Sequence, residues 1–214
     1  MHQIVIDTSV LIAALRSSRG ASYRLLEMTG DARWQLNMSV ALALEYEATG
    51  KREAIKLGIP ESSIDVIVDV LCEKSWHHAV HFRLRPELSD PDDEFVLELA
   101  FVARCDFIVT HNLRDLQAAE RFGIRVVTPG EILEDNGSGA MNRTISLPEE
   151  LLKKAEELAA REHLPVKEFL CAKLSEQFAG LEYLKQRAER SSAEKFRSAL
   201  RSIPDVEPEE YDRF

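Results

Sequence analysis

Short apolar runs alternate with longer helical patterns over roughly the first 133 residues of the chain. Runs typical of buried strands fall at Gln3–Ile6, Trp34–Met38, Trp76–Phe82, Phe107–Thr110 and Ile124–Thr128. Apolar residues recur at helical spacing in Ser9–Leu15, Val40–Thr49, Glu61–Glu73 and Asp93–Arg104. Strands separated by helices of this length are typical of crossovers onto a parallel sheet. This part of the chain therefore predicts an α/β domain.

The pattern changes after residue 135. Residues 136–140 are Asn-Gly-Ser-Gly-Ala, a composition typical of a flexible linker. Met141 follows at once and begins a differently built segment, which favours a fusion of two reading frames, natural or engineered, over an ordinary internal methionine. We predict one domain over residues 1–135 and a second over residues 141–181.

The second domain has one short strand followed by two helices. The strand covers Asn142–Leu147, the first helix follows Pro148, and the second opens at Pro165. A single strand cannot form a sheet, so a second copy must supply the partner strand. We therefore predict a homodimer or a higher even oligomer.

Composition excludes several classes of protein. The chain has 214 residues, of which 45% are hydrophobic, so it has enough apolar material to form a core. It contains no apolar run long enough to span a membrane, and residues 1–7 lack a signal-peptide pattern, so we expect a cytoplasmic protein without a membrane partner. Its three cysteines show no CxxC spacing, which argues against a disulfide framework or a zinc site.

Acidic and amide side chains fall at the expected strand ends and within one apolar helix. Asp7 ends the first strand, Asp93 opens a helix, and Asn112 and Asp115 follow the strand Phe107–Thr110. In an open α/β sheet, ligands bind at the carboxyl ends of the strands. Glu45 lies in an otherwise apolar helical stretch, where a carboxylate needs compensation. Converging carboxylates without Cys or His favour Mg²⁺ or Mn²⁺.

Each acid also has a purely structural interpretation. Asp7 and Asp93 are well placed to cap the helices that follow them. Glu45 could face solvent, with Glu47 equally available for the role assigned to it. The occurrence of the acids at successive strand ends favours the functional interpretation over four separate coincidences.

Four motifs in order resemble a PIN domain of the VapC-like toxin group. They are Ile4–Leu11, Ser39 with Glu45–Glu47, Asp90–Asp93 with Leu99 and Ala100, and Val109–Leu116, so the resemblance covers residues 1 to about 133. It implies an α/β/α sandwich around a central parallel sheet and a metal-dependent ribonuclease. By motif position, Asp7 and Asp93 would be the metal ligands, Glu45 a second acid, and Thr8 and Ser9 hydroxyls near the metal.

One position departs from the family pattern, because many relatives carry aspartate where this chain has Asn112. Asp115, one helical turn later, is the candidate to supply that charge. The catalytic candidates are therefore Asp7, Thr8, Glu45, Asp93, Asn112 and Asp115. A metal ion held by Asp7 and Asp93 would activate water for attack on a phosphodiester, with Glu45 or Asp115 positioning or deprotonating the water.

Charge bears on how such a substrate would bind. Residues 1–140 hold 14 Lys and Arg against 22 Asp and Glu, a net charge of −8, which does not by itself favour a polyanion. Local cations would have to bind the RNA backbone. The candidates are Arg16, Arg19, Arg24, Lys51, Arg52 and Arg114.

The histidines offer weaker candidates. His77 and His81 would lie one turn apart on a helix, as metal ligands often do, but Trp76–Phe82 alternates like a strand, which favours solvated or edge positions. His111 lies inside the last PIN-like motif. We expect it to be exposed, with contact to a substrate phosphate as the alternative.

Residues 141–181 resemble a ribbon-helix-helix domain of the kind found in antitoxins. The resemblance rests on Arg143–Pro148, the amphipathic helix to Arg161 and the helix from Pro165. It implies that paired strands enter the major groove of operator DNA. The candidate DNA-binding residues are Asn142, Thr144 and Ser146, which point outward by strand alternation, and Arg143, assigned to a phosphate or to the strand edge. A dimerisation module without DNA binding is the alternative.

Residues 182–214 form the tail. Tyr183–Leu200 predicts one amphipathic helix, and the last twelve residues hold one basic against five acidic side chains. Such a segment should become ordered on a partner surface, which the antitoxin resemblance identifies as the nuclease. An arginine entering the carboxylate cluster would inhibit it, and Arg197, Arg201 and Arg213 are the candidates, the alternative being a solvated tail.

These observations lead to one interpretation with two alternatives. The leading one is a toxin and its antitoxin on one chain, a Mg²⁺-dependent ribonuclease inhibited by its own C-terminal segment. Asn112 favours a catalytically inactive DNA-binding regulator instead. A nuclease acting on DNA is the third possibility.

Overall fold

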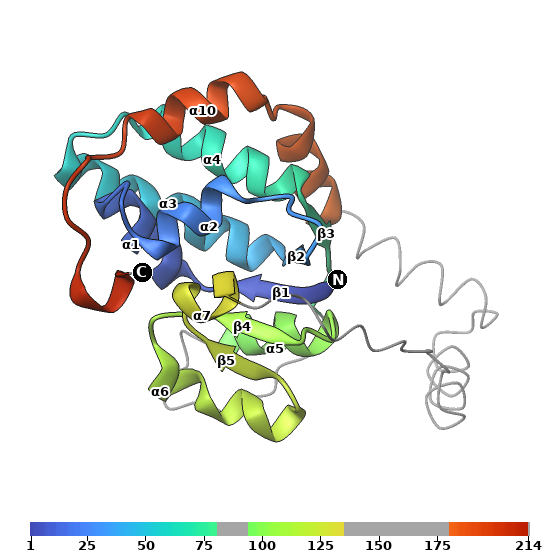
Figure 1. Ribbon diagram of the computed structural model, residues 1–214. Coiled ribbons are helices and arrows are strands. Elements are labelled where there is room, and N and C mark those ends of the chain that lie inside the picture. The colour runs from blue at the N-terminus through green and yellow to red at the C-terminus, as the bar shows by residue number, and fades with distance from the viewer. Residues whose placement is uncertain (81–93, 135–179, 214) are drawn as a thin grey trace.

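A computed structural model describes residues 1–80, 94–134 and 180–213, and its centre is a five-stranded sheet (Figure 1). The strands are β1 (His2–Ile6), β2 (Trp34–Met38), β3 (Ser75–His77), β4 (Phe107–Val109) and β5 (Arg125–Val127). Every pairing is parallel, in the order β3-β2-β1-β4-β5. The predicted parallel α/β architecture is therefore confirmed.

Helices flank this sheet on both sides (Figure 1). They are α1 (Thr8–Arg16), α2 (Ala21–Glu27), α3 (Val40–Leu57), α4 (Glu61–Glu73), α5 (Glu94–Val102), α6 (Leu113–Leu116), α7 (Pro129–Glu134) and α10 (Ala193–Arg201), with 3₁₀ turns at η1 (Gln117–Phe122) and η2 (Glu210–Asp212). Residues 180–189 form a further helix. No helix in these described segments is long and apolar enough to cross a membrane.

The order of the strands places the central crevice beside β1. The chain proceeds outward from β1 to β2 and β3, then crosses to β4 on the other side of β1. In open α/β sheets, a reversal of this kind opens a crevice at the carboxyl ends of the strands. Here those ends are Ile6 and Val109, which lie directly opposite each other in the β1–β4 register. The residues that follow them, Asp7 and Thr110, therefore meet.

Two elements differ from the sequence prediction for reasons of packing. Helix α3 continues to Leu57 instead of ending at Thr49, because Gly50 lies against Ile64 of α4, where an added Cβ would be 2.8 Å from the Ile64 Cγ2 atom. The glycine thus marks a close approach of two helices and does not end the helix. Strand β3 has only three residues, and positions 81 and 82 of the predicted run lie outside the described residues.

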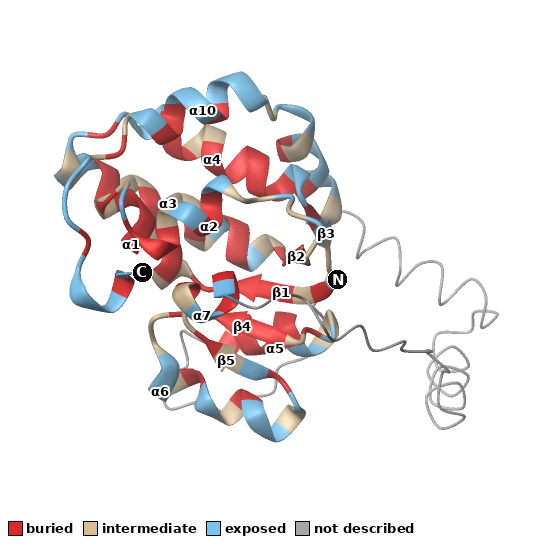
Figure 2. Cartoon of the chain, in the orientation of Figure 1, coloured by how far each residue is buried: buried red, intermediate tan, exposed pale blue. Residues whose placement is uncertain are grey.

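The apolar core extends from the sheet into the C-terminal segment (Figure 2). Leu184, Phe196, Leu200 and Ile203 are all buried in the same cluster as the strands. Helix α10 packs along α4 and leaves its outer face exposed (Figures 1 and 2). The C-terminal segment is therefore part of the folded unit.

The prediction of one helix over Tyr183–Leu200 is wrong. The helix of residues 180–189 ends, and α10 begins after Ser192, whose hydroxyl accepts a hydrogen bond from the Lys195 amide. A serine at this position stabilises a new helix start, which apolar periodicity alone does not reveal. The predicted linker and nearly all of the predicted ribbon-helix-helix domain, including its four DNA-binding candidates, lie outside the described residues.

Candidate active site

Asp7 occupies the crevice at the end of β1. Its Oδ2 atom accepts hydrogen bonds from the hydroxyls of Ser9 (2.5 Å) and Thr110 (2.8 Å) and from the Ser9 amide (3.3 Å). The residue caps α1 and is buried. The capping interpretation is thus confirmed, and one carboxylate oxygen performs this structural role, while the functional interpretation of Asp7 stays a prediction.

The second oxygen and the next residue fit a cation. Among the described residues, no donor bonds to Oδ1 of Asp7, since every hydrogen bond to this carboxylate ends on Oδ2. The Thr8 hydroxyl is buried without a hydrogen-bond partner in the same part of the structure. A carboxylate oxygen without a donor and an unsatisfied hydroxyl are each oxygen ligands of the kind that Mg²⁺ or Mn²⁺ prefers.

Helix α3 is fixed to the crevice through Tyr46. The Tyr46 hydroxyl donates to the carbonyl of Ile6, the residue before Asp7, and burial, together with the charge of Asp7, raises the pKa of this phenol well above its ordinary value. Glu45 is half-buried, and its Oε1 accepts a hydrogen bond from the Thr49 hydroxyl at 2.5 Å. The structure therefore places Glu45 next to the residue that touches the strand end.

The residues after β4 form the other wall of the site. Thr110 bonds to Asp7 and also accepts a hydrogen bond from the Asn112 amide at 2.8 Å. Asp115 is half-buried in the short helix α6 that begins at the next residue, Leu113. Thr110 was not among the sequence candidates, although its place at the strand end within the motif was the available signal.

Asp93 lies outside the described residues, so its relation to Asp7 is not part of the site geometry. Within residues 1–80, 94–134 and 180–213, no three His, Cys, Asp or Glu side chains form a group that could hold a metal ion. Helix α5 begins at Glu94 and carries two buried carboxylates, Glu94 and Glu98, which sequence reasoning missed. Their spacing of four residues in an otherwise apolar helix was the signal.

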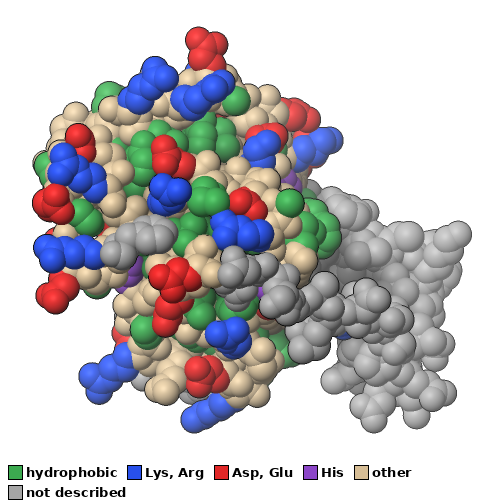
Figure 3. Space-filling view, in the orientation of Figure 1, with side chains coloured by type: hydrophobic (Ala, Val, Ile, Leu, Met, Phe, Trp, Pro, Cys, Tyr) green, Lys and Arg blue, Asp and Glu red, His purple; other side chains and the backbone are tan. Residues whose placement is uncertain are grey.

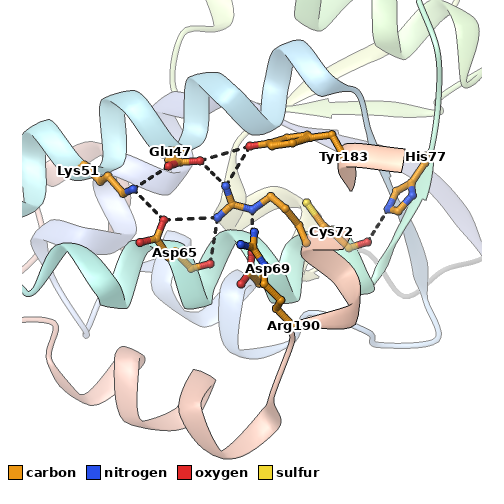
Figure 4. Close-up of polar contacts among 9 residues, drawn as sticks. Glu47, Lys51, Asp65, Asp69, Cys72, His77, Tyr183 and Arg190 are labelled. Atoms are coloured by element: carbon orange, nitrogen blue, oxygen red, sulfur yellow. Dashed lines mark hydrogen bonds and ion pairs between the residues drawn. The ribbon is translucent and has the colours of Figure 1, made fainter. Parts of the chain in front are cut away.

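The buried arginine of the C-terminal segment is Arg187, which was not among the three inhibitory candidates. Its guanidinium contacts the carboxylates of Glu47 on α3 and of Asp65 and Asp69 on α4, as Figure 4 shows for these acids. Burial opposes its charge, but the hydrogen bond with Tyr183 and the charge of Asp69 raise its pKa above the ordinary value. Arg187 thus joins the tail to α3 and α4.

The three candidate arginines lie elsewhere on the tail. Arg197 donates to the Ala193 carbonyl of its own helix at 3.1 Å, and Arg201 and Arg213 are exposed. Their proposed entry into the carboxylate cluster stays a prediction. The tail residue that lies beside the site is Asp212.

Asp212 is the residue of the tail that reaches the site. Its Oδ1 accepts hydrogen bonds from the amide (2.8 Å) and the hydroxyl (2.6 Å) of Ser22, and it lies 3.4 Å from Nε2 of His111. The His111 side chain is only 9% exposed, so the expectation of an exposed histidine is wrong. Tyr211, whose ring centroid lies 4.7 Å from that of His111, and Asp212 cover it.

The histidines near β3 have structural partners. The Nε2 atom of His77 lies 2.8 Å from the Cys72 carbonyl, and that of His78 lies 2.7 Å from Oδ1 of Asn37. Burial lowers the pKa of His78. Both positions agree with an edge strand.

Several cations predicted to bind RNA already have acidic or polar partners. Lys51 pairs with Glu47 and Asp65, Arg16 pairs with Glu53, and Arg52 donates to Thr49. Arg19 pairs with two carboxylates of the tail. Charges of both signs are interspersed on the visible face (Figure 3), so no extended basic surface is seen there.

Residues 3–114, just over half of the chain, match the family model described as PIN domain. Comparisons with curated proteins and with solved structures find no match.

Proposed function

The chain belongs to the PIN domain family, and we propose that it is a metal-dependent endoribonuclease that hydrolyses RNA phosphodiester bonds. The observation that supports this most directly is the arrangement of Asp7. Its carboxylate lies at the switch point of the sheet with one oxygen fixed by Ser9 and Thr110 and the other available to a cation.

The residues of the site have distinct roles in this proposal. Asp7 and Asp93 would hold Mg²⁺ or Mn²⁺, which when bound neutralises charge on the phosphate and lowers the pKa of water. Ser9 and Thr110 orient the carboxylate of Asp7. Glu45 or Asp115 would position or deprotonate the attacking water. The Thr8 hydroxyl and the Asn112 side chain would contact the substrate or the metal.

The test compares wild type with Asp7→Asn on a labelled single-stranded RNA, with Mg²⁺, with Mn²⁺ and with EDTA. Residues 1–135 are assayed beside the full chain, with circular dichroism to confirm that the fragment folds. We expect cleavage by the fragment only with metal, and a loss on the order of 100-fold or more in Asp7→Asn, since removing even an outer partner of a metal ligand typically costs about 10–100-fold. Metal-independent cleavage, or full activity in Asp7→Asn, would contradict the proposal.

We also propose that residues 180–213 inhibit the nuclease. The helical part of the tail is buried against α3 and α4, and Asp212 ends beside His111, whose amide donates to Ser9. Inhibition predicts that the full chain cleaves RNA more slowly than the fragment, and that a separate polypeptide of residues 136–214 restores inhibition. Equal rates for fragment and full chain would count against it.

The proposed ribbon-helix-helix domain has its own test. Residues 141–181 would dimerise and bind operator DNA through Asn142, Arg143, Thr144 and Ser146, which suits a toxin and antitoxin carried on one chain. Thr144→Ala should weaken binding to the promoter region of the gene in an electrophoretic mobility shift assay. An unchanged shift would contradict readout by the strand.

One observation favours a second function. Asn112 stands where many relatives carry aspartate. Its backbone amide donates a hydrogen bond to the Thr110 hydroxyl, but its side chain carries no charge. If the chain cleaves no nucleic acid under any of the metal conditions but binds operator DNA, it is a DNA-binding regulator. Cleavage of DNA in place of RNA would identify a nuclease of the third kind considered above.

A further inference from the structure

The C-terminal residues 203–213, here called the acidic hook, run along the loop between α1 and α2 and end beside α1 (Figure 1). The hook carries five acidic side chains and one arginine, which are Asp205, Glu207, Glu209, Glu210, Asp212 and Arg213. It therefore brings negative charge to the edge of the proposed nuclease site.

The first contacts of the hook fill the donors of that loop. Arg19 binds Asp205 through Nε (2.5 Å) and Glu207 through an Nη atom (3.0 Å). The Ser17 hydroxyl donates to the Val206 carbonyl, and the Ser18 amide to the Pro204 carbonyl. Each of these four donors is thus met by an oxygen of the hook.

The last contact is the most enclosed. Asp212 is buried, and its Oδ1 accepts hydrogen bonds from the amide and the hydroxyl of Ser22. Nε2 of His111 lies 3.4 Å from the same oxygen. The other oxygen of Asp212, Oδ2, is buried without a partner among the described residues. The carboxylate fits only because residue 20 is glycine, since a Cβ there would lie 1.9 Å from Oδ2.

A short series of contacts connects this carboxylate to Asp7. The His111 amide donates to the Ser9 hydroxyl, which donates to Asp7. The Nε2 atom of the same histidine lies 2.8 Å from the Ser22 hydroxyl that binds Asp212. The hook therefore ends at the border of the crevice in which RNA would be cleaved.

We propose that the surface formed by Arg19, Ser22 and His111 binds phosphate groups of the RNA backbone, and that the acidic hook occupies this surface in their place. A guanidinium, a hydroxyl with its backbone amide and an imidazole are the groups that bind phosphate oxygens in protein–nucleic acid complexes. The inference rests on the proposed function, because it specifies how that nuclease binds and is denied its substrate.

The hook is held weakly enough to be displaced by a polyanion. The Arg19 side chain is 49% exposed, and those of Asp205 and Glu207 are more exposed still, so their pairing is weak and sensitive to salt. Asp212 is bound more firmly, but with one unsatisfied oxygen it is not bound optimally. Phosphates that satisfy the same donors can therefore compete.

Gly20→Ala tests this without changing any charge. The backbone of Gly20 (φ −79°, ψ 161°) suits alanine, and the three heavy atoms nearest to the new Cβ belong to Asp212. Binding of a fluorescent single-stranded RNA of about 20 nucleotides is measured by anisotropy in EDTA. We expect Gly20→Ala, and also Asp212→Ala, which adds no Cβ beside the Ser22 donors, to bind roughly tenfold more tightly than wild type, because the hook no longer competes.

The matched control is Gly130→Ala, the same substitution at a position where the nearest atom to the new Cβ is the Thr128 hydroxyl at 4.0 Å. It should bind RNA like wild type. Adding Arg19→Gln to Gly20→Ala should abolish most of the gain, and adding Gly20→Ala to Asp212→Ala should give no further gain, since both act on one contact.

A second pair of variants guards against a carboxylate that reorients within the site. The triple variant Asp205→Asn, Glu207→Gln, Asp212→Asn removes three charges from the hook, whereas Glu182→Gln, Glu189→Gln, Glu194→Gln removes three from the helical part of the tail. The inference predicts a larger gain in affinity for the first triple variant. Equal affinities in this pair, together with no gain in Gly20→Ala, would overturn it.

The outcomes separate this inference from the proposed function. Tighter RNA binding by Gly20→Ala without cleavage in Mg²⁺ or Mn²⁺ would leave the phosphate surface standing and refute the nuclease. Metal-dependent cleavage with unchanged RNA affinity would leave the nuclease standing and refute the phosphate surface.

Discussion

The two parts of the C-terminal segment contact the same α/β domain in opposite ways. The helical part, residues 180–201, buries apolar side chains and one arginine against α3 and α4. The acidic hook makes mostly exposed polar contacts and buries one carboxylate. The two kinds of contact therefore have different roles. The first part holds the segment in place, and the second covers donors that a ligand can claim.

Arg187 illustrates the first kind of contact. Its side chain is 3% exposed and lies among Glu47, Asp65 and Asp69, with Tyr183 beside it (Figure 4). A buried ion pair adds little net stability over an apolar substitute, but removing one partner leaves uncompensated charges behind. Removing this side chain should therefore lower the free energy of unfolding strongly.

The largest expected effect is that of Arg187→Ala. It should lower the free energy of unfolding by about 3–5 kcal/mol, because Asp69 and Glu47 lose their buried counter-charge. Urea denaturation followed by circular dichroism measures the loss. Arg190→Ala is the matched control, since Arg190 pairs with the same Asp69 but is 62% exposed, and should change stability by about 1 kcal/mol or less. Similar losses in both variants would erase the contrast between buried and exposed contacts.

An intermediate effect should depend on pH. Hydrogen bonding to Lys51, together with the charge of Arg187, lowers the pKa of Glu47. A carboxyl group with a lowered pKa in the folded state stabilises the protein above its unfolded pKa of about 4.3, and this contribution is lost as pH falls through the folded pKa. Glu47→Gln should therefore reduce stability by roughly 1–2 kcal/mol at pH 7.

This difference between wild type and Glu47→Gln should shrink below about pH 4. Thermal unfolding from pH 3 to 7 measures it. Arg19 lowers the pKa of Asp205 as well, but Asp205 is exposed, so Asp205→Asn should give nearly parallel curves. A difference in stability between wild type and Glu47→Gln that stays constant with pH would show that the charge of the carboxylate does not contribute.

The smallest effect on stability should come from Arg19→Gln. Its two ion pairs lie in solvent, so the free energy of unfolding should fall by about 1 kcal/mol or less at low salt and not measurably at high salt. Denaturation in 50 mM and 500 mM NaCl checks this. A large, salt-independent loss would place the acidic hook in the same class as the helical part and remove the distinction.

The sheet and the position of Asp7 could be predicted from the sequence, because buried parallel strands are continuous apolar runs and Asp7 directly ends one of them. The roles of the two Asp7 oxygens could not be predicted, because a cap and a ligand have the same sequence signature. Only the hydrogen bonds show that the structural contacts all fall on Oδ2.

The C-terminal segment was harder to interpret. Its ordering on a partner surface followed from amphipathic spacing, and the antitoxin resemblance implied which surface. The choice of arginine followed from neither, because Arg187 and Arg197 look alike in a helix and differ only in what their helix faces. The role of Asp212 depends on Gly20, nearly two hundred residues away in sequence. A contact between residues so far apart leaves no local pattern.

The burial of Leu184 and Ile203 in the main core means that the acidic hook starts from a fixed anchor. A short tether keeps the effective concentration of a ligand at its site high, whatever the amount of protein in solution. The balance between the hook and a competing polyanion should then be independent of dilution of the protein and respond only to the supply of the competitor. Under the proposed competition, release of the hook would depend on the concentration of nucleic acid and not on the concentration of the protein.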